Sequence, residues 1–448
     1  MTSKPILIRN GRLIDPASST DVQRDLLLRD GKIAAIEAPG KIKAAGAETI
    51  DAKGRVVAPG LIDIHVHLRE PGQGYKETIA TGTSAAAAGG FTTVCAMPNT
   101  TPVNDSPEIT RWMLAPERGA SIRVLPIAAA TIGSNGETLT NYAALKDAGA
   151  IAVTDDGRPI LGDAIMLEAL RAATAQGLPV IQHAEDTRLT GGCSMNAGAL
   201  AFRLGLRGIP IEAESGLVER DIDLVRKVPN AHLHVAHLST KKALDAVRAA
   251  RKAGLHVTCE VTPHHFALTE ERIGHYDTNA KMNPPLRAES DRAAMIEGLL
   301  DGTIDAIATD HAPHAAHEKE QEFDRAPNGI TGLETALGLA IRILHLEHKM
   351  PLVKVLALLT TRPAQALSLK GQGSLSIGAP ADLILFDPAQ KWIFRAADSK
   401  SKSKNTPFDG WELYGHVHWT LFQGESRYAG AFKSMVPPPY IRGEKRIY

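Results

Sequence analysis

The sequence has no excess of charge of either sign, because its 448 residues include 50 basic and 50 acidic side chains. This balance gives no indication of nucleic acid or an anionic membrane surface as a partner, since both favour clustered Lys and Arg. The chain also has no apolar run long enough to span a bilayer and no secretory or twin-arginine signal at its start. We therefore expect a protein of the cytoplasm, without a membrane or a nucleic acid as partner.

Cysteine is scarce, and its pattern excludes a disulfide framework. Cys95, Cys193 and Cys259 are odd in number, far apart, and form no CxxC motif. This usage indicates a reducing compartment, where such side chains serve as small buried groups. Hydrophobic residues make up 44% and charged residues 22% of the chain, as in an ordinary globular protein with a sizeable core. The length predicts one large barrel plus a smaller unit, or two domains.

Both ends of the chain have β character. Short apolar runs at residues 6–8, 25–28 and 32–36 are separated by Asn10-Gly11 and Asp30-Gly31, which are hairpin turn signals. Near the other end, residues 381–387 and 415–422 are expected strands. We expect the two ends to pair in a small β-sandwich domain of residues 1–58 and 373–448, beside a catalytic domain of residues 59–372.

Between these ends, short apolar strands recur, most of them separated by alanine-rich helical stretches. The runs begin at Leu61 and continue at residues 91–96, 122–128, 150–154, 179–182, 231–236, 256–261 and 304–308. Continuous apolar strands that alternate with helices predict parallel strands buried on both faces. Eight such units predict an α/β fold, a (β/α)8 TIM-like barrel, whose chemistry lies at the carboxyl ends of its strands. The later Ser-Lys run at residues 399–404 is expected to be a solvated loop.

Metal-ligand side chains follow several of these strands. His65 and His67 lie two residues apart at the end of the first strand, so their side chains project from one face. A lone HxH pattern is as readily a chance feature of a strand. However, five different strands of the same barrel contribute such residues, which packing does not explain. They are His65, His67, Asp155, Asp156, His183, His237 and Asp310.

This set of ligands indicates a hydrolytic metal centre. Nitrogen and carboxylate ligands without cysteine suit zinc or a similar divalent ion. Such ions lower the pKa of bound water to about 7, which supplies hydroxide at neutral pH. Two ions would need a bridging acid, for which Asp156 is the candidate and Asp155 the nearest competitor.

The motifs together resemble those of the amidohydrolase superfamily and, within it, the class I dihydroorotases. The resemblance covers nearly the whole chain and rests on residues 59–72 (PGLIDIHVHLREPG), 97–100 (MPNT), 155–157 (DDG), 183–185 (HAE), 260–265 (EVTPHH), 281–287 (KMNPPLR), 310–314 (DHAPH) and 332–335 (GLET). It implies a metal-dependent hydrolase barrel that catalyses the reversible ring opening of dihydroorotate to N-carbamoyl-aspartate in pyrimidine synthesis.

Carried over position by position, the resemblance implies two zinc ions bridged by Asp156 and a hydroxide. The first ion would bind His65, His67, Asp156 and Asp310, and the second would bind Asp156, His183 and His237. Asp310 would take the hydroxide proton and return it to the departing ring nitrogen.

The resemblance also implies a pocket for the substrate. Arg69 can grip the substrate carboxylate bidentately. The expected substrate-binding residues are His67, Arg69, Asn99, Asn283, His314, Asn328 and Gly329. Asn99 and Asn283 stand beside prolines, and shaping a turn is the alternative role for each. Asn328 departs from the family pattern, because many members have Phe at this place.

Two other functions stay open at this point. Allantoinases and hydantoinases resemble this arrangement but bridge their metals with a carboxylated lysine, whereas strand four here ends in Thr154-Asp155-Asp156. A non-catalytic scaffold for aspartate transcarbamoylase would typically have lost metal ligands, and none is missing. Some class I enzymes pair with aspartate transcarbamoylase, so such a complex and a homodimer are the expected partners.

Overall fold

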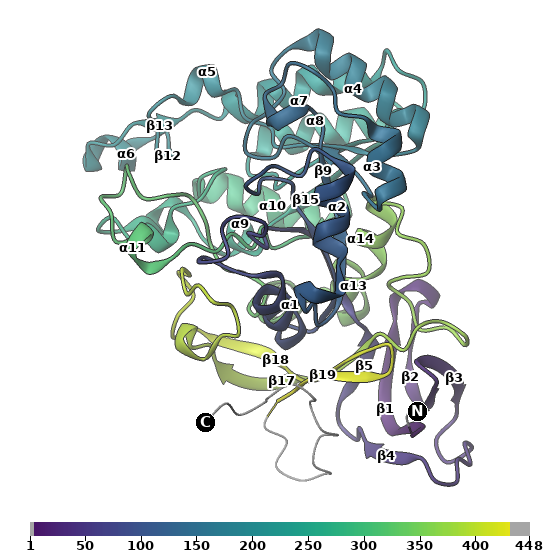
Figure 1. The fold of residues 1–448 in the computed structure, drawn as a ribbon. Helices are drawn as coiled ribbons and strands as arrows, with labels where there is room; N and C mark the ends of the chain where they lie inside the picture. The colour runs from purple at the N-terminus through teal and green to yellow at the C-terminus, as the bar shows by residue number, and fades with distance from the viewer. Residues whose placement is uncertain (1–3, 431–448) are drawn as a thin grey trace, which may run out of the picture.

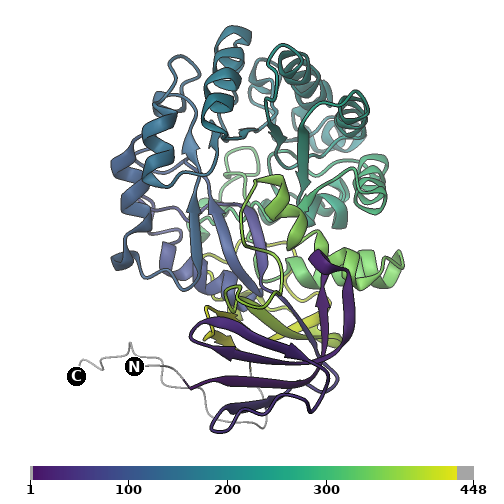
Figure 2. The ribbon, with the colours of Figure 1, turned by 90° about the vertical axis from the view of Figure 1, so that its right-hand side faces the viewer.

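Eight parallel strands form a closed barrel in the computed structural model, which describes residues 4–430 (Figures 1 and 2). This confirms the predicted barrel. In order, its strands are β6 (Leu61–Val66), β7 (Phe91–Ala96), β8 (Arg123–Pro126) with β9 (Ala128–Ala129), β10 (Val153–Thr154), β11 (Val180–Gln182), β14 (Leu233–Val235), β15 (Val257–Val261) and β16 (Ala306–Ile307). The ring closes beside β6, where Val66 bridges His311 and the His67 amide donates to the His311 carbonyl at 2.9 Å.

Helices surround this barrel, as Figure 2 shows from one side. The strands are mostly apolar, as expected of strands covered on both faces; Leu61, Ile62 and Ile64 of β6 are all buried. The main covering helices are α1 (Ile79–Ala88), α2 (Pro107–Leu114), α3 (Tyr142–Ala148), α4 (Asp163–Gln176), α7 (Glu212–Val225), α8 (Lys241–Lys252), α10 (Glu289–Asp301), α12 (Ala336–Ala340), α13 (Leu352–Ala357) and α14 (Thr361–Ala366). A π-helical segment, Ile341–Glu347, follows α12.

Strands from both ends of the chain pair beside the barrel, as predicted for the β-sandwich, and hydrogen bonds connect all of them in one sheet (Figure 2). They are β1 (Ile6–Asp15), β2 (Thr20–Arg29), β3 (Lys32–Glu37), β4 (Glu48–Asp51), β5 (Val56–Pro59), β17 (Leu383–Ile393), β18 (Glu412–Phe422) and β19 (Glu425–Ala429). β5 pairs with β1 on one side and with β17 on the other, and Gly60 then leads directly into β6. The predicted domain limits stay a proposal, and their last part, residues 431–448, lies outside the described residues.

One predicted turn is wrong. Asn10-Gly11 lies inside β1, where the pairing with β2 shifts register between Ile8 and Gly11. Asn10 adopts a positive φ of 61°, and its main-chain N–H donates to the buried Asp25 carboxylate at 2.9 Å. The pair therefore forms a bulge, and the chain reverses instead at Pro16–Ser18. Asp30-Gly31 does form the turn between β2 and β3.

The Ser-Lys run is the second correction, because residues 399–404 are not simply a solvated loop. Its lysines are exposed, but Ser401 and Ser403 are buried against the barrel. The Ser401 hydroxyl donates to the carboxylate of Glu77, and the Ser403 hydroxyl donates to the Lys76 carbonyl at 2.6 Å. Alternating residues thus face the barrel and the solvent.

A long excursion leaves the barrel after β11 and returns at α7 (Figure 1). It contains α5 (Thr187–Thr190), β12 (Met195–Asn196), α6 (Ala199–Leu204) and β13 (Gly208–Ile209). Two further short helices lie after later strands, α9 (Pro263–Ala267) and α11 (Ala316–Lys319). Within residues 4–430, none of the helices combines the length and the apolar character needed to cross a membrane.

Candidate metal centre

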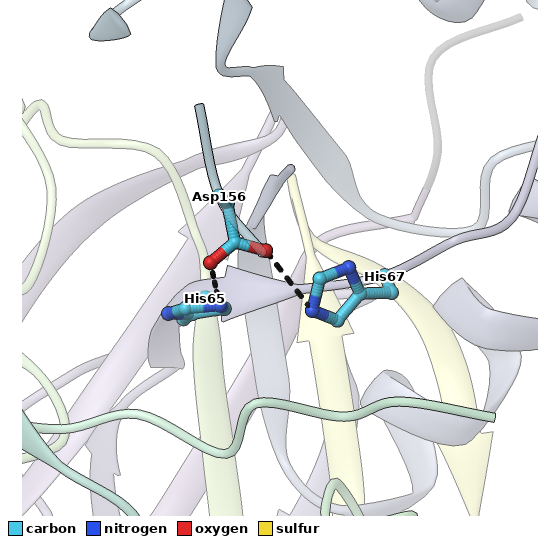
Figure 3. A group of neighbouring side chains, drawn as sticks. All are labelled: His65, His67 and Asp156. Carbon is cyan, nitrogen blue, oxygen red and sulfur yellow. Dashed lines mark ion pairs between the residues drawn. The ribbon is translucent and has the colours of Figure 1, made fainter. Parts of the chain in front are cut away.

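Two histidines at the end of β6 and the second of the two acids after β10 form the core of the centre. His65 and His67 lie on one face at the end of β6, and both are buried. Figure 3 shows the Asp156 carboxylate between the two rings. Its oxygens lie 3.6 Å from His65 Nε2 and 3.7 Å from His67 Nε2. The adjacent Asp155 does not take part, because it accepts from the amide and the hydroxyl of Thr131.

Three more predicted ligands complete the cluster from other strand ends. His183 follows β11 and His237 follows β14, and their facing nitrogens, Nδ1 and Nε2, are 2.9 Å apart. Asp156 Oδ1 lies 3.7 Å from His183 Nδ1 and 3.9 Å from His237 Nε2. Asp310 Oδ1 lies 2.9 Å from His67 Nε2. All six predicted metal-ligating residues therefore come together at the carboxyl end of the barrel.

The spacing of these atoms fits metal ions. Ligands about 2.0–2.2 Å from a tetrahedral zinc ion lie roughly 3.3 Å from one another. His65 Nε2 is buried and has no hydrogen-bond partner among the described residues, yet it lies 3.6 Å from both Asp156 and Asp310. The separation is too long for a hydrogen bond and suits two ligands of one ion. Three sets of three ligand atoms lie within 4.8 Å of one another: His65, His67 and Asp156; His65, His237 and Asp310; and Asp156, His183 and His237.

The charge of the cluster also favours a cation. Burial opposes protonation of His65, but the surrounding carboxylates, Asp310 first, raise its pKa to about 10. Burial raises the pKa of Asp156, and the neighbouring histidines, His65 first, lower it well below its usual range. Buried carboxylates of this kind need a compensating positive charge. A divalent ion on the histidine nitrogens supplies that charge without a proton.

Carboxylates behind the cluster orient two of the histidines, and neither carboxylate had a predicted role. Glu260 of β15 accepts from His65 Nδ1 at 2.7 Å, which leaves Nε2 with a free lone pair toward Asp156. Glu185 accepts from His183 Nε2 at 3.0 Å and leaves Nδ1 free in the same way. A signal for Glu260 existed, because an acid within an apolar, two-sided buried strand needs a partner.

A pocket of about 290 Å³ opens over the cluster. It is lined by all the predicted substrate-binding residues except Gly329, which follows the lining residue Asn328 in the chain. The lining residues are His67, Arg69, Asn99, Asp156, Gly157, His183, His237, Met282, Asn283, Asp310, Ala312, His314 and Asn328. Five of the six predicted ligands, all but His65, thus share one cavity with most of the predicted substrate contacts.

One wall of this pocket carries positive charge. Arg69 is buried, and its Nε donates to the Pro313 carbonyl at 3.0 Å. Its Nη2 lies 3.2 Å from His314 Nε2, which in turn lies 2.9 Å from the Asn328 carbonyl. Burial lowers the pKa of Arg69 to about 10, so the guanidinium stays charged at neutral pH. This wall suits an anionic group of a ligand.

Two of the three predicted asparagines, Asn99 and Asn283, contact groups of the centre. Asn99 places its Oδ1 2.7 Å from His67 Nδ1, and its Nδ2 donates to Asp156 at 3.0 Å. Asn283 Nδ2 donates to Glu185 at 2.7 Å. Both side chains therefore hold ligand geometry as well as line the pocket, and their contact with a substrate stays a prediction.

Solved structures with the same fold include hydantoinases and dihydropyrimidinases. The L-hydantoinase (dihydropyrimidinase) from Arthrobacter aurescens aligns with a TM-score of 0.84 at 24% identity, over 97% of this chain and 98% of its own. The dihydropyrimidinase from Brevibacillus agri aligns with a TM-score of 0.81 at 24% identity, over 94% of each chain. At this identity the likeness establishes the barrel and its companion sheet.

Sequence relatives are much closer. The dihydroorotase of Solibacter usitatus is 49% identical over 421 residues, which are 94% of this chain and 97% of that protein. The dihydroorotase of Syntrophotalea carbinolica is 49% identical over 425 residues, 94% of this chain and 99% of that protein. The model of the family described as dihydro-orotase-like matches residues 54–243. With the ligand cluster and near full-length identity of this degree, the chain belongs to the dihydroorotase family of cyclic amidohydrolases.

Proposed function

We propose that this protein is a zinc-dependent dihydroorotase that hydrolyses (S)-dihydroorotate reversibly to N-carbamoyl-L-aspartate, a step of pyrimidine synthesis. The observation that carries this proposal is a cluster of six metal-ligand side chains, five of which line one cavity together with a cationic wall. The centre suits hydrolysis of an amide, and Arg69 on the wall suits a substrate that bears a carboxylate. The names of the relatives support the same choice.

Two zinc ions are the proposed cofactors. One would be held by His65, His67, Asp156 and Asp310, and the other by Asp156, His183 and His237. The residue types favour zinc over magnesium or calcium, which prefer all-oxygen sites. When bound, such ions supply hydroxide at neutral pH and polarise the carbonyl of an amide.

Asp310 is the proposed proton carrier. Its carboxylate lies in the pocket, follows β16, and is 2.9 Å from His67. A carboxylate so placed between the cluster and the cavity can accept the proton of the attacking water and release it to the ring nitrogen that departs. One group then serves both directions of the reversible reaction.

The remaining predicted contacts would orient the substrate. Arg69, Asn99 and His314 would bind the carboxylate, and the Arg69 fork gives two parallel hydrogen bonds. Asn283 would face the ring. Asn328 and Gly329 would contact it through main-chain groups. Burial of Arg69 strengthens its pairing with an anion, because water competes less inside the pocket.

The test is consumption of dihydroorotate by the purified protein, with bound metal counted on the same sample. Asp310→Ala is the site variant, and Asp223→Ala, on an exposed face of α7, is its matched control. We expect turnover of dihydroorotate alone, and neither of allantoin nor of hydantoin, with about two zinc ions per chain. Activity should be lost in Asp310→Ala and kept in Asp223→Ala.

Other outcomes would contradict the proposal in distinct ways. Full metal without dihydroorotate turnover would assign the site to another cyclic amide. A protein without metal and without turnover would favour the scaffold role beside aspartate transcarbamoylase.

We infer further that the protein works in the cytoplasm as a homodimer and forms a complex with aspartate transcarbamoylase. The three cysteines are free, as a reducing compartment predicts. The excursion between α5 and α7 carries exposed apolar side chains, and Phe202 is 89% exposed. Exposed apolar groups of this kind support association with another protein surface.

A further inference from the structure

One asparagine outside the barrel joins the two chain segments that form the cationic pocket wall. Asn405 lies in the connection between β17 and β18, just after the Ser-Lys run, and this yellow segment rises from the terminal sheet toward α11 in Figure 1. The residue is buried, with 4% of its surface exposed. No metal ligand and no pocket-lining residue comes from this part of the chain, within the described residues.

The side chain of Asn405 makes three hydrogen bonds to two separate segments. Its Nδ2 donates to the Ala312 carbonyl at 3.0 Å and to the Gly329 carbonyl at 2.9 Å. Its Oδ1 accepts from the His314 amide at 2.9 Å. The Asn405 carbonyl also accepts from the Thr331 amide at 2.9 Å. The amide group therefore uses both donors and one acceptor position.

These contacts hold together the segment after β16 and the loop before α12. Ala312 and His314 of the first segment and Asn328 of the second all line the pocket. The two segments also touch directly, because His314 Nε2 lies 2.9 Å from the Asn328 carbonyl. Space between them is tight: a Cβ on Gly329 would lie 2.5 Å from the Ala312 carbonyl oxygen. A small displacement of either segment thus changes the distance between His314 and the 328–329 main chain.

We propose that Asn405 is a positioning residue. It sets the spacing between His314, which would bind the substrate carboxylate, and the main chain at Asn328 and Gly329. This inference rests on the proposed function. Only an amide side chain of this length meets two carbonyls and one amide at once. An aspartate would present an anion to two carbonyl oxygens. An alanine would leave the buried Ala312 carbonyl and His314 amide without this partner.

The experiment compares steady-state kinetics of Asn405→Asp and Asn405→Ala with wild type and with Lys400→Ala. Lys400 is exposed in the same segment, so its variant controls for general effects on this connection. We expect both Asn405 variants to raise the KM for dihydroorotate by about tenfold or more while kcat changes by less than about threefold. Zinc content and melting temperature, measured on the same samples, separate this effect from loss of the metal centre or of the fold.

A double-mutant cycle with His314→Ala tests whether Asn405 acts through the pocket wall. If it does, Asn405→Asp raises KM much less in the His314→Ala background than in wild type. Equal effects in both backgrounds would overturn the inference, as would an unchanged KM in either Asn405 variant. Loss of zinc in both Asn405 variants would also overturn it, because the residue would then support the centre itself. Failure of the proposed function is a separate result, namely wild type that does not turn over dihydroorotate.

Discussion

The Glu260 carboxylate lies behind the metal ligands and accepts hydrogen bonds from three donors. It is buried and accepts from His65 Nδ1 at 2.7 Å, from His234 Nε2 at 3.2 Å and from the His237 amide at 3.4 Å. Burial by itself raises the pKa of this carboxyl group, but His65 and His234 lower it to about 2. Three donors converge on two oxygens, so only a carboxylate satisfies all of them.

We therefore expect Glu260→Gln to weaken zinc binding by about 10–100-fold, because one oxygen becomes an NH₂ group that faces a donor. Competition with a chromogenic chelator measures this affinity. Glu219→Gln, on the exposed face of α7, is the matched control and should bind zinc like wild type. Wild-type affinity in Glu260→Gln would show that His65 needs no fixed tautomer.

Asp155 and Asp156 form a natural pair for a second test. Asp156 faces four histidines, whereas Asp155 is held by Thr131 on the other side of the chain. We expect Asp156→Asn to lose bound zinc and to lower kcat/KM by about 100-fold or more. Asp155→Asn should keep its zinc, since the Asn oxygen still accepts from the Thr131 amide. Zinc content after dialysis distinguishes the two aspartates. Loss of zinc in Asp155→Asn alone would show that Asp155, and not Asp156, is the bridging acid.

At this scale, the sequence predicts ligands better than their supports. His65, His67 and Asp310 stand at strand ends, where chain order alone brings them to one rim. The roles of Glu260, Glu185 and Asn405 depend on which way a side chain points across neighbouring strands or connections. The choice between Asp155 and Asp156 has the same origin, because adjacent residues at a strand end face opposite directions.

Among the elements, the loop at residues 324–329 is held by two buried lysines. Lys281 Nζ donates to the carbonyls of Asp324 and Ala326, at 3.0 and 2.7 Å. Lys319 Nζ donates to the Pro327 carbonyl at 2.8 Å and lies 3.3 Å from the Gly329 carbonyl. Burial lowers the pKa of Lys319 to about 7, and the charge of Lys281 acts in the same direction.

This lysine makes the stability of the fold depend on pH. Between about pH 7 and 10.5 the unfolded chain binds a proton on Lys319 that the folded chain does not, so stability rises with pH there. We expect wild type to gain stability relative to Lys319→Met over that range, by up to about 1.4 kcal/mol per pH unit. Urea unfolding of both proteins at several pH values measures the difference, in which all other groups cancel. A difference that is constant with pH would contradict the shifted pKa.

Local sequence signals predicted elements well where the element depends on local chemistry alone. Asp30-Gly31 forms a turn because both residues adopt positive φ, at 52° and 73°. Asn10 also adopts positive φ, yet the buried Asp25 carboxylate and the pairing of β1 with β5 carry the strand onward. The Ser-Lys run was mispredicted for a similar reason, since the carboxylate of Glu77 binds it from far along the chain.

Across the whole molecule, the terminal sheet and the barrel are joined by buried and half-buried contacts. The Thr420 hydroxyl of β18 donates to the Ala87 carbonyl of α1 at 2.7 Å, and Thr420 is fully buried. Arg123 of β8 pairs with Asp382 at 2.8 Å. β5 continues through Gly60 into β6, the strand that contains His65 and leads to His67. Disruption of the sheet is therefore expected to displace the metal-ligating histidines.

We expect the sheet and the barrel to unfold together. Three of the four tryptophans, Trp392, Trp411 and Trp419, belong to the terminal sheet or its long connection, so fluorescence reports mainly on this part. Zinc release into a chromogenic chelator reports on the barrel. In a urea titration the two signals should share one midpoint, because buried contacts couple the parts.

Thr420→Val sharpens this test, because it removes one buried hydrogen bond between the parts at a cost of about 1 kcal/mol. Its matched control is Thr49→Val on the exposed edge of β4. If the sheet and the barrel unfold together, Thr420→Val should lower the fluorescence midpoint and the zinc-release midpoint equally, and Thr49→Val should change neither. If fluorescence changed at lower urea while zinc stayed bound, the sheet would unfold as a separate unit. The connection from β5 into β6 would then not stabilise the metal centre.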